Sequence, residues 1–240
     1  MYVNTSVECE TLPKNERIEK LGIYKFVGYT SVAINLEYSN TKNYKSILHE
    51  IQKNTTLCVY GKVLLYPKTI DTLKKILNSL QIHTDQLIAV HSTDKEILTF
   101  SANDSRVDII SIPRILDLMH ITPGIISLVK SNKKFLEISL NDIVKTKIHE
   151  RSRLFHELSK FLQLIGNNTH ILLHGGSEDS VYQIRGPFEI VTIFNAIFDV
   201  PLNKSKLIVK SNPEQLIRML NERSGIQYKQ FGVRAIPWSE

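Results

Sequence analysis

Three short apolar runs in the middle of the chain read Leu87-Ile-Ala-Val90, Val107-Asp-Ile-Ile110 and Phe135-Leu-Glu-Ile138. Polar residues flank each run, a pattern typical of buried parallel strands. Five further runs resemble them, at Tyr2–Val7, Thr30–Leu36, Leu57–Leu65, Ile171–Leu173 and Leu207–Val209. The sequence therefore predicts eight strands spread along the whole chain.

Helical patterns fill the gaps between these predicted strands. Apolar residues recur at helical spacing over residues 70–80 and again over 148–165. A capping-type residue precedes a proline at Thr122-Pro123, Gly186-Pro187 and Asn212-Pro213, and each pair predicts a helix start. The last helix is predicted to run from Pro213 to about Arg223.

Alternating strands and helices predict a parallel sheet with right-handed crossovers. Eight such units close naturally into a single (β/α)8, TIM-barrel-like α/β domain. We assign residues 1–223 to this barrel and residues 224–240 to a C-terminal tail. A doubly wound open sheet is the alternative, and periodicity does not separate the two architectures.

Composition points to a cytoplasmic protein. The chain has 240 residues, of which 42% are apolar, enough for one sizeable core. No apolar run reaches the roughly 18 residues of a membrane span, and no signal peptide is evident. Cys9 and Cys58 are the only cysteines, which predicts reduced, buried thiols instead of a disulfide framework.

The charge distribution permits contact with nucleic acid. The formal net charge is +6 and the pI is near 9.2, which allows RNA binding without establishing it. Much of the excess lies between Lys130 and Arg153, where seven Lys and Arg residues face three acidic residues. An ordinary solvated surface is the competing interpretation.

The sequence lacks the common catalytic signatures. No Walker loop, dinucleotide fingerprint or nucleophile elbow occurs. None of the eight histidines forms a His-x-His pair, and only His91 and His174 follow predicted strands, where a barrel keeps its functional groups. Two histidines are too few for a di- or trinuclear metal site, so the sequence predicts neither a catalytic residue nor a metal ligand.

One loop could hold a phosphate. The run Ile171–Leu173 leads into Gly175-Gly176-Ser177, and Arg185 precedes the helix predicted to begin at Pro187. Glycines let backbone N–H groups approach an anion, and a helix N-terminus carries positive partial charge. The competing interpretation is a tight turn with Arg185 paired to a nearby acid.

Basic residues are also scattered over other loops and helices. Such an arrangement suits contacts to backbone phosphates over a broad surface, not base reading. With the loop residues, the candidate RNA- and phosphate-binding set is Lys62, Arg106, Arg151, Arg153, Gly175, Gly176, Ser177, Arg185 and Lys210.

An ordered series of motifs resembles the ribonuclease P protein component 3 family. The series comprises Ile171-Leu-Leu-His-Gly-Gly-Ser177, Ile184-Arg-Gly-Pro187 and Lys210-Ser-Asn-Pro-Glu214, preceded by Asp85-Gln-Leu-Ile-Ala-Val90 and the next two strand runs. The likeness covers about residues 57–223. His174-Gly175 replaces the family's usual Ser-Ser, and the first strand lacks its usual aspartate.

The resemblance implies a non-catalytic subunit of archaeal and eukaryal ribonuclease P, the endoribonuclease that removes the 5′ leader of precursor tRNA. It implies a PHP-related barrel that has lost its metal ligands. The implied partners are the ribonuclease P RNA, a small ferredoxin-like-fold subunit in a two-plus-two assembly, other ribonuclease P proteins and, indirectly, precursor tRNA. No cofactor is implied for this chain, and Mg²⁺ would belong to the active site of the RNA.

Two enzymatic alternatives remain open from the residues. One is a metal-dependent phosphoesterase of the same barrel class, using His91 and His174. The other is a barrel enzyme that holds a small phosphorylated metabolite at Arg185, Gly175 and Lys210.

Overall fold

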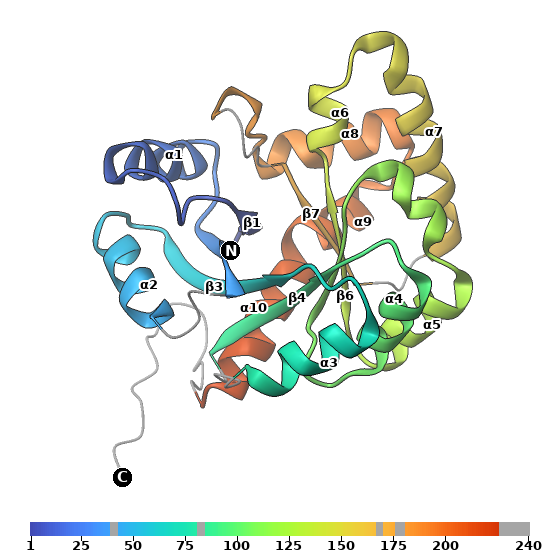
Figure 1. The fold of residues 1–240 in the computed structure, drawn as a ribbon. Helices are drawn as coiled ribbons and strands as arrows, with labels where there is room; N and C mark the ends of the chain where they lie inside the picture. Colours follow the sequence, from blue (N-terminus) through green and yellow to red (C-terminus); the bar gives the residue numbers. More distant parts are fainter. Residues whose placement is uncertain (39–42, 81–84, 167–169, 176–180, 226–240) are drawn as a thin grey trace.

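Seven parallel strands alternate with helices in the computed structural model, which describes residues 1–38, 43–80, 85–166, 170–175 and 181–225 (Figure 1). The strands pair in chain order, from β1 to β7. Their bounds are β1 Val3–Val7, β2 Ser31–Leu36, β3 Cys58–Leu65, β4 Gln86–His91, β5 Ile109–Ile112, β6 Phe135–Ser139 and β7 Ile171–His174. Each matches a predicted strand to within two residues at either end.

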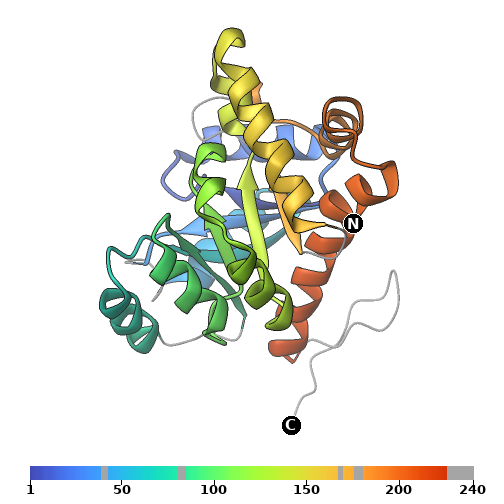
Figure 2. The same ribbon diagram turned by 90° about the vertical axis from the view of Figure 1, so that its right-hand side faces the viewer.

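Helices follow the strands and form the outer layer, as Figures 1 and 2 show. In the N-terminal part they are α1 Lys14–Phe26, α2 Tyr44–Lys53, α3 Ile70–Ser79, α4 Lys95–Asn103, the 3₁₀ helix η2 Ile115–His120 and α5 Pro123–Ser131. The C-terminal part has α6 Asn141–Lys145, α7 Ile148–Ile165, the 3₁₀ turn η3 Val181–Gln183, α8 Pro187–Phe198, α9 Leu202–Lys206, the π-helix η4 Leu207–Ser211 and α10 Asn212–Arg223.

The predicted starts at Thr122-Pro123 and Gly186-Pro187 are confirmed. Helix α5 begins at Pro123, where the Thr122 side chain accepts a hydrogen bond from the Ile125 backbone N–H. Helix α8 begins at Pro187 after Gly186, which lies in an extended conformation. Proline fits both starts because the first helical position has no partner for an N–H group.

Each strand is buried on both faces. One face packs outward against the surrounding helices, and the other packs inward in the barrel interior. On β5 and β6, Ile110 and Leu136 pack outward against helices α4, α5 and α7. Their neighbours Ile109 and Phe135 point inward and share a cluster with side chains from β1, β2, β4 and β7. This alternation identifies the inner cluster as the filling of a barrel.

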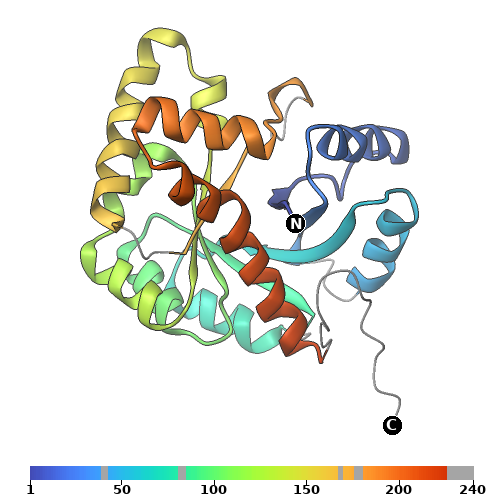
Figure 3. The same cartoon turned by 180° about the vertical axis from the view of Figure 1, so that it is seen from behind.

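The last helix closes one end of this barrel. Leu216, Ile217 and Leu220 of α10 pack on the inner cluster, together with Val3 of β1 and Leu172 of β7. Figure 3, the view from behind, shows α10 crossing in front of the strands. Further along the strands the inward positions become polar, so the interior has an apolar half next to α10 and a polar half toward the carboxyl ends of the strands.

The predicted eighth strand, Leu207–Val209, is wrong. These residues form the π-helix η4, and the chain runs helically from Leu202 to Arg223 without the predicted break before Pro213. Ile208 and Val209 are buried, which explains the apolar run, since a short apolar run can be buried in either conformation. The TIM-barrel-like fold is confirmed, with seven strands and a helical closure between β7 and β1.

The cysteine prediction is confirmed for one thiol only. Cys9 is buried, and burial raises the pKa of its thiol to about 11. Cys58 is exposed because it lies at the very start of β3, outside the packed part of the strand. Both thiols are free.

Candidate nucleic-acid interface

A buried ion pair crosses the polar half of the barrel. The Lys62 ammonium on β3 donates hydrogen bonds to both carboxylate oxygens of Glu137 on β6, at 3.1 and 3.0 Å. Thr5 on β1 donates to the same carboxylate at 2.8 Å. Lys62 is 0% exposed and Glu137 is 1% exposed. The prediction that Lys62 contacts RNA is therefore wrong for the folded chain, because its side chain points inward and not to the surface.

The charged form of Glu137 is stabilised by its neighbours in the barrel. Burial alone would raise the pKa of Glu137, but nearby Lys62 and His174 and the hydrogen bonds from Lys62 and Thr5 hold that pKa below its ordinary value. Burial lowers the pKa of His174 to about 4, although the Glu137 carboxylate opposes the shift. The interior at neutral pH thus holds an ammonium, a carboxylate and a neutral imidazole.

The strand ends do not assemble a metal centre from the described residues. In the described ranges, no group of three or more His, Cys, Asp or Glu side chains is placed to hold a metal ion. His91 Nδ1 lies 3.3 Å from the Ser111 hydroxyl, and the His91 ring packs on Tyr66. The Glu137 carboxylate near His174 is already matched by the Lys62 ammonium, and an ammonium at that position opposes a metal cation.

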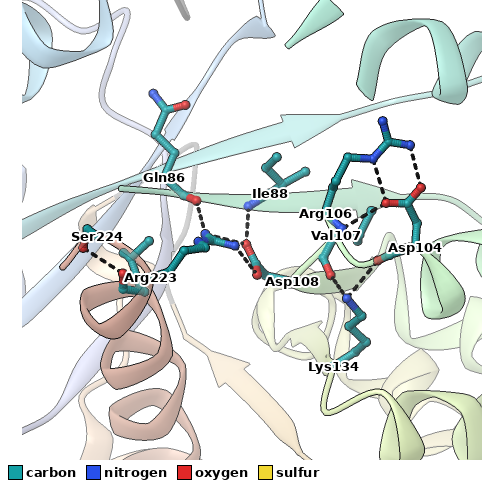
Figure 4. A network of polar contacts seen from close by, with 10 residues as sticks. Gln86, Ile88, Asp104, Arg106, Val107, Asp108, Lys134, Arg223 and Ser224 are labelled. Atoms are coloured by element: carbon teal, nitrogen blue, oxygen red, sulfur yellow. Dashed lines mark hydrogen bonds and ion pairs between the residues drawn. The ribbon is translucent and has the colours of Figure 1, made fainter. Parts of the chain in front are cut away.

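Arg106 lies at the opposite end of the barrel, before β5 (Figure 4). Its guanidinium pairs with Asp104, with Nε–Oδ1 and Nη2–Oδ2 distances of 2.9 and 2.7 Å, and also donates to Asn78. In the same network, Arg223 of α10 pairs with Asp108, and Lys134 donates to the carbonyls of Asp104 and Val107. Arg106 therefore stabilises the fold at this end of the barrel, before β5.

The two arginines of α7 differ in their surroundings. The Arg151 guanidinium donates to the backbone carbonyls of Thr146 and Val144, so it fastens the end of α6 to the start of α7. Arg153 is exposed. Of these two candidate residues, Arg153 is the one that presents its charge to solvent.

The loop after β7 places Arg185 beside Gly175. The Arg185 backbone N–H donates to the Gly175 carbonyl at 2.8 Å. A Cβ atom on Gly175 would lie 2.8 Å from the Arg185 Cβ and 3.1 Å from its carbonyl oxygen. Close packing thus accounts for glycine at 175. Gly176 and Ser177 lie outside the described residues.

The N-terminus of α8 already has an acidic partner. The Glu189 carboxylate accepts the Gly186 backbone N–H at 2.8 Å. An anion at this helix start would compete with that carboxylate. The Nη1 atom of Arg185 donates to the carbonyls of Tyr182 and Ile184, and the side chain is half-buried.

Lys210 lies on η4, next to the ring of Tyr2. Its ammonium is 6.0 Å from the centroid of the Tyr2 ring, and the Tyr2 ring packs on Phe188 of α8 at 5.4 Å. The helical closure thus brings Lys210 next to the start of the helix that follows Arg185. Sequence reasoning included both cations but missed Tyr2, Tyr182 and Phe188. The Gly-Pro pair just before Phe188 was the available signal, because it placed this residue in the first turn of a helix.

No helix within the described part of the chain is both long and apolar enough to cross a membrane.

The comparisons with known proteins each match most or nearly all of this chain. The family described as RNase P subunit p30 matches residues 1–224. "Ribonuclease P protein component 3" of Methanococcus maripaludis is 25% identical over 195 residues, which cover 80% of this chain and 82% of that protein. A chain in a cryo-EM structure of archaeal ribonuclease P with mature tRNA superposes with a TM-score of 0.76 at 16% identity, covering 99% of both chains. Seven paired strands, the helical closure and the family match over residues 1–224 together show that the chain belongs to the RNase P subunit p30 family.

Proposed function

We propose that this chain is a non-catalytic protein subunit of ribonuclease P, which binds the catalytic RNA and supports removal of the 5′ leader from precursor tRNA. The family match over residues 1–224 carries this proposal. The ion pair in the barrel supports the non-catalytic assignment, because Lys62 occupies the interior from which related barrels present metal ligands.

The RNA-binding surface that we propose lies on the half-buried or exposed cations. These are Arg153 on α7, Arg185 after η3 and Lys210 on η4. Lysine and arginine neutralise backbone phosphates and release counterions, so binding should weaken steeply with salt. Arg106 contributes less to this proposed surface, since its guanidinium charge is already matched by the Asp104 carboxylate. Arg151 donates to backbone carbonyls, as Arg185 does, and it stays a candidate at the start of α7.

Membership of the family supports a proposal for the partners. We propose that the chain works in the cytoplasm with ribonuclease P RNA, with a small ferredoxin-like subunit in a two-plus-two assembly and with other ribonuclease P proteins. Contact with precursor tRNA would then be indirect. No cofactor is assigned to this chain, and Mg²⁺ would act within the RNA.

Reconstitution tests the proposal directly. Ribonuclease P RNA and the other protein subunits are assembled with and without this chain, and cleavage of precursor tRNA is measured at several salt concentrations. We expect the complete assembly to cleave faster and to bind RNA with a negative slope of log affinity against log salt. Equal cleavage with and without the chain, or binding that does not change with salt, would refute the proposal.

Reversing the charge of one residue tests whether it belongs to the proposed RNA-binding surface. Arg185→Glu should lower RNA affinity and cleavage without unfolding the chain. Lys53→Glu, an equal charge change at an exposed site at the end of α2, is the matched control. Equal effects of the two variants would remove Arg185 from the surface and leave only a contribution of net charge.

A further inference from the structure

Two aromatic side chains stand in solvent next to Arg185. Tyr182 in η3 is 87% exposed, and Phe188 in the first turn of α8 is 65% exposed. Aromatic rings supply large apolar areas that folding normally covers, and exposed groups of them mark binding surfaces. These two rings lie on one short segment, with Arg185 midway between them in sequence.

The fold holds this segment firmly. The hydroxyl of Tyr29, two residues before β2, donates to the Arg185 carbonyl at 3.0 Å. A Cβ atom on Gly186 would lie 2.5 Å from the Val27 carbonyl oxygen, so the backbones of the two segments touch. The Phe188 ring then rests on Tyr2 with an interplanar angle of 59°. The Phe188 ring and the backbone at Arg185 and Gly186 are therefore preorganised, which lowers the entropic cost of binding.

The charged side chains around these rings indicate which kind of partner the surface would bind. Arg185 lies between Tyr182 and Phe188 in sequence, and the Lys210 ammonium approaches the Tyr2 ring. Of the acids described nearby, Glu189 accepts a hydrogen bond from the Gly186 N–H, and Glu214 pairs with the amino group of Met1. We call Tyr2, Tyr182, Arg185, Phe188 and Lys210 the aromatic-basic surface. Aromatic faces stack on unpaired bases, while Arg and Lys bind the phosphates that join them.

We infer that the aromatic-basic surface binds unpaired nucleotides of RNA, with bases stacked on Tyr182 and Phe188 and phosphates held by Arg185 and Lys210. This inference rests on the proposed function and sharpens it. Lysine and arginine alone would bind the phosphates of duplex and single-stranded RNA alike. Stacking on aromatic rings requires bases that are not paired in a duplex. The surface therefore selects single-stranded segments of a structured RNA.

Binding of a short probe tests the inference on the full-length protein. The probe is an eight-nucleotide RNA containing 2-aminopurine, used single-stranded and annealed to its complement. Phe188→Leu and Tyr182→Leu keep an apolar side chain but remove the aromatic face, and Tyr66→Leu is the matched control, since Tyr66 is 63% exposed at the end of β3. Circular dichroism verifies folding of each variant.

We expect Phe188→Leu and Tyr182→Leu each to weaken single-strand binding about fivefold or more. Duplex binding should change less than about twofold, and Tyr66→Leu should match the wild type. Quenching of 2-aminopurine by the wild type should diminish in both aromatic variants. Equal losses on duplex and single strand, or no loss at all, would overturn the inference.

Reconstituted ribonuclease P separates this inference from the proposed function. If Arg185→Glu impairs RNA binding while both aromatic variants behave as wild type, the function stands and the stacking fails. If the wild-type chain adds nothing to the assembly, the function itself fails. Should Phe188→Leu weaken binding to another protein subunit but leave RNA affinity intact, the surface is a protein interface and the inference is overturned.

Discussion

Lys62 lies on the inner face of β3, where its ammonium meets the Glu137 carboxylate across the barrel. Removing one partner of a buried ion pair leaves an unmatched charge in a medium of low dielectric constant. We expect Lys62→Met to lower the free energy of unfolding by about 3–5 kcal/mol, measured by urea denaturation. Adding Glu137→Gln should restore much of that loss, and Lys53→Met on the surface should cost under about 0.5 kcal/mol. A loss below about 1 kcal/mol for Lys62→Met would contradict this account.

His174 should make the protein sensitive to acid. Its folded-state pKa is about 4, whereas an unfolded histidine titrates near pH 6.5, so the unfolded chain takes up this proton first as the pH falls. The stabilisation is complete above about pH 6.5 and is lost toward pH 4, with a slope of up to about 1.4 kcal/mol per pH unit.

His174→Gln should flatten this part of the profile. Urea denaturation at pH 7.5, 6.5, 5.5 and 5.0 measures the slope for both proteins. Some dependence should remain in the variant, because burial also lowers the pKa of His91 and His170. Identical slopes for the two proteins would show that His174 does not contribute.

The sequence could not reveal which way Lys62 points. Along β3 the residues on both sides of Lys62 are apolar or small, because both faces of the strand are covered. A strand buried on both faces lacks the alternation that distinguishes inside from outside. For Arg185 and Lys210 the sequence did identify side chains that reach the surface, but it could not bring Tyr2 next to them, since Tyr2 is 186 residues from Phe188.

At the scale of elements, the junction between the end of α1 and the start of α8 depends on one glycine. Gly186→Ala places a methyl group 2.5 Å from the Val27 carbonyl oxygen. Because this oxygen belongs to the backbone, relieving the clash requires the backbone to shift. We expect a loss of about 1–3 kcal/mol in the free energy of unfolding.

Gly22→Ala within α1 is the matched control. No atom lies within 4 Å of a Cβ built on Gly22, and alanine suits a helix better than glycine by up to about 1 kcal/mol. This substitution should therefore stabilise the chain. If Gly186→Ala proves as stable as the wild type, the two segments pack less closely than the structure indicates.

Seven of the eight predicted strands are confirmed. Six of them are largely apolar runs that end at polar residues, while β1 is interrupted by Asn4, Thr5 and Ser6. Leu207–Val209 has the same composition but packs as part of a helix. Its partners decide the outcome: Ile208 and Val209 join the outer core with Phe194 of α8, and the Asn212 side chain donates to the Ile171 carbonyl at the start of β7. Such tertiary contacts are not visible in a three-residue pattern.

At the scale of the whole molecule, the candidate cations divide between the two ends of the barrel. Arg106 belongs to the network around α10, while Arg185 follows the carboxyl end of β7. Arg106→Gln should lower the free energy of unfolding by about 1 kcal/mol and leave RNA affinity unchanged.

Arg185→Gln should show the reverse pattern. We expect weaker RNA binding, a salt slope smaller by about one and nearly unchanged stability. Urea denaturation and RNA titrations at several salt concentrations measure both quantities for both variants. A weaker RNA affinity in Arg106→Gln would place the binding surface at the α10 end of the barrel.

The closure by α10 also has a consequence for biosynthesis. Val3 of β1 and Leu216 of α10 lie in the same inner cluster, so the filling of the barrel is incomplete until α10 has been translated. Contacts this distant in sequence slow folding. A nascent chain stalled before residue 212 would therefore leave the inner side chains of β1, β4 and β7 open to water, and it would depend on chaperones that shield apolar surface until the final helix emerges from the ribosome.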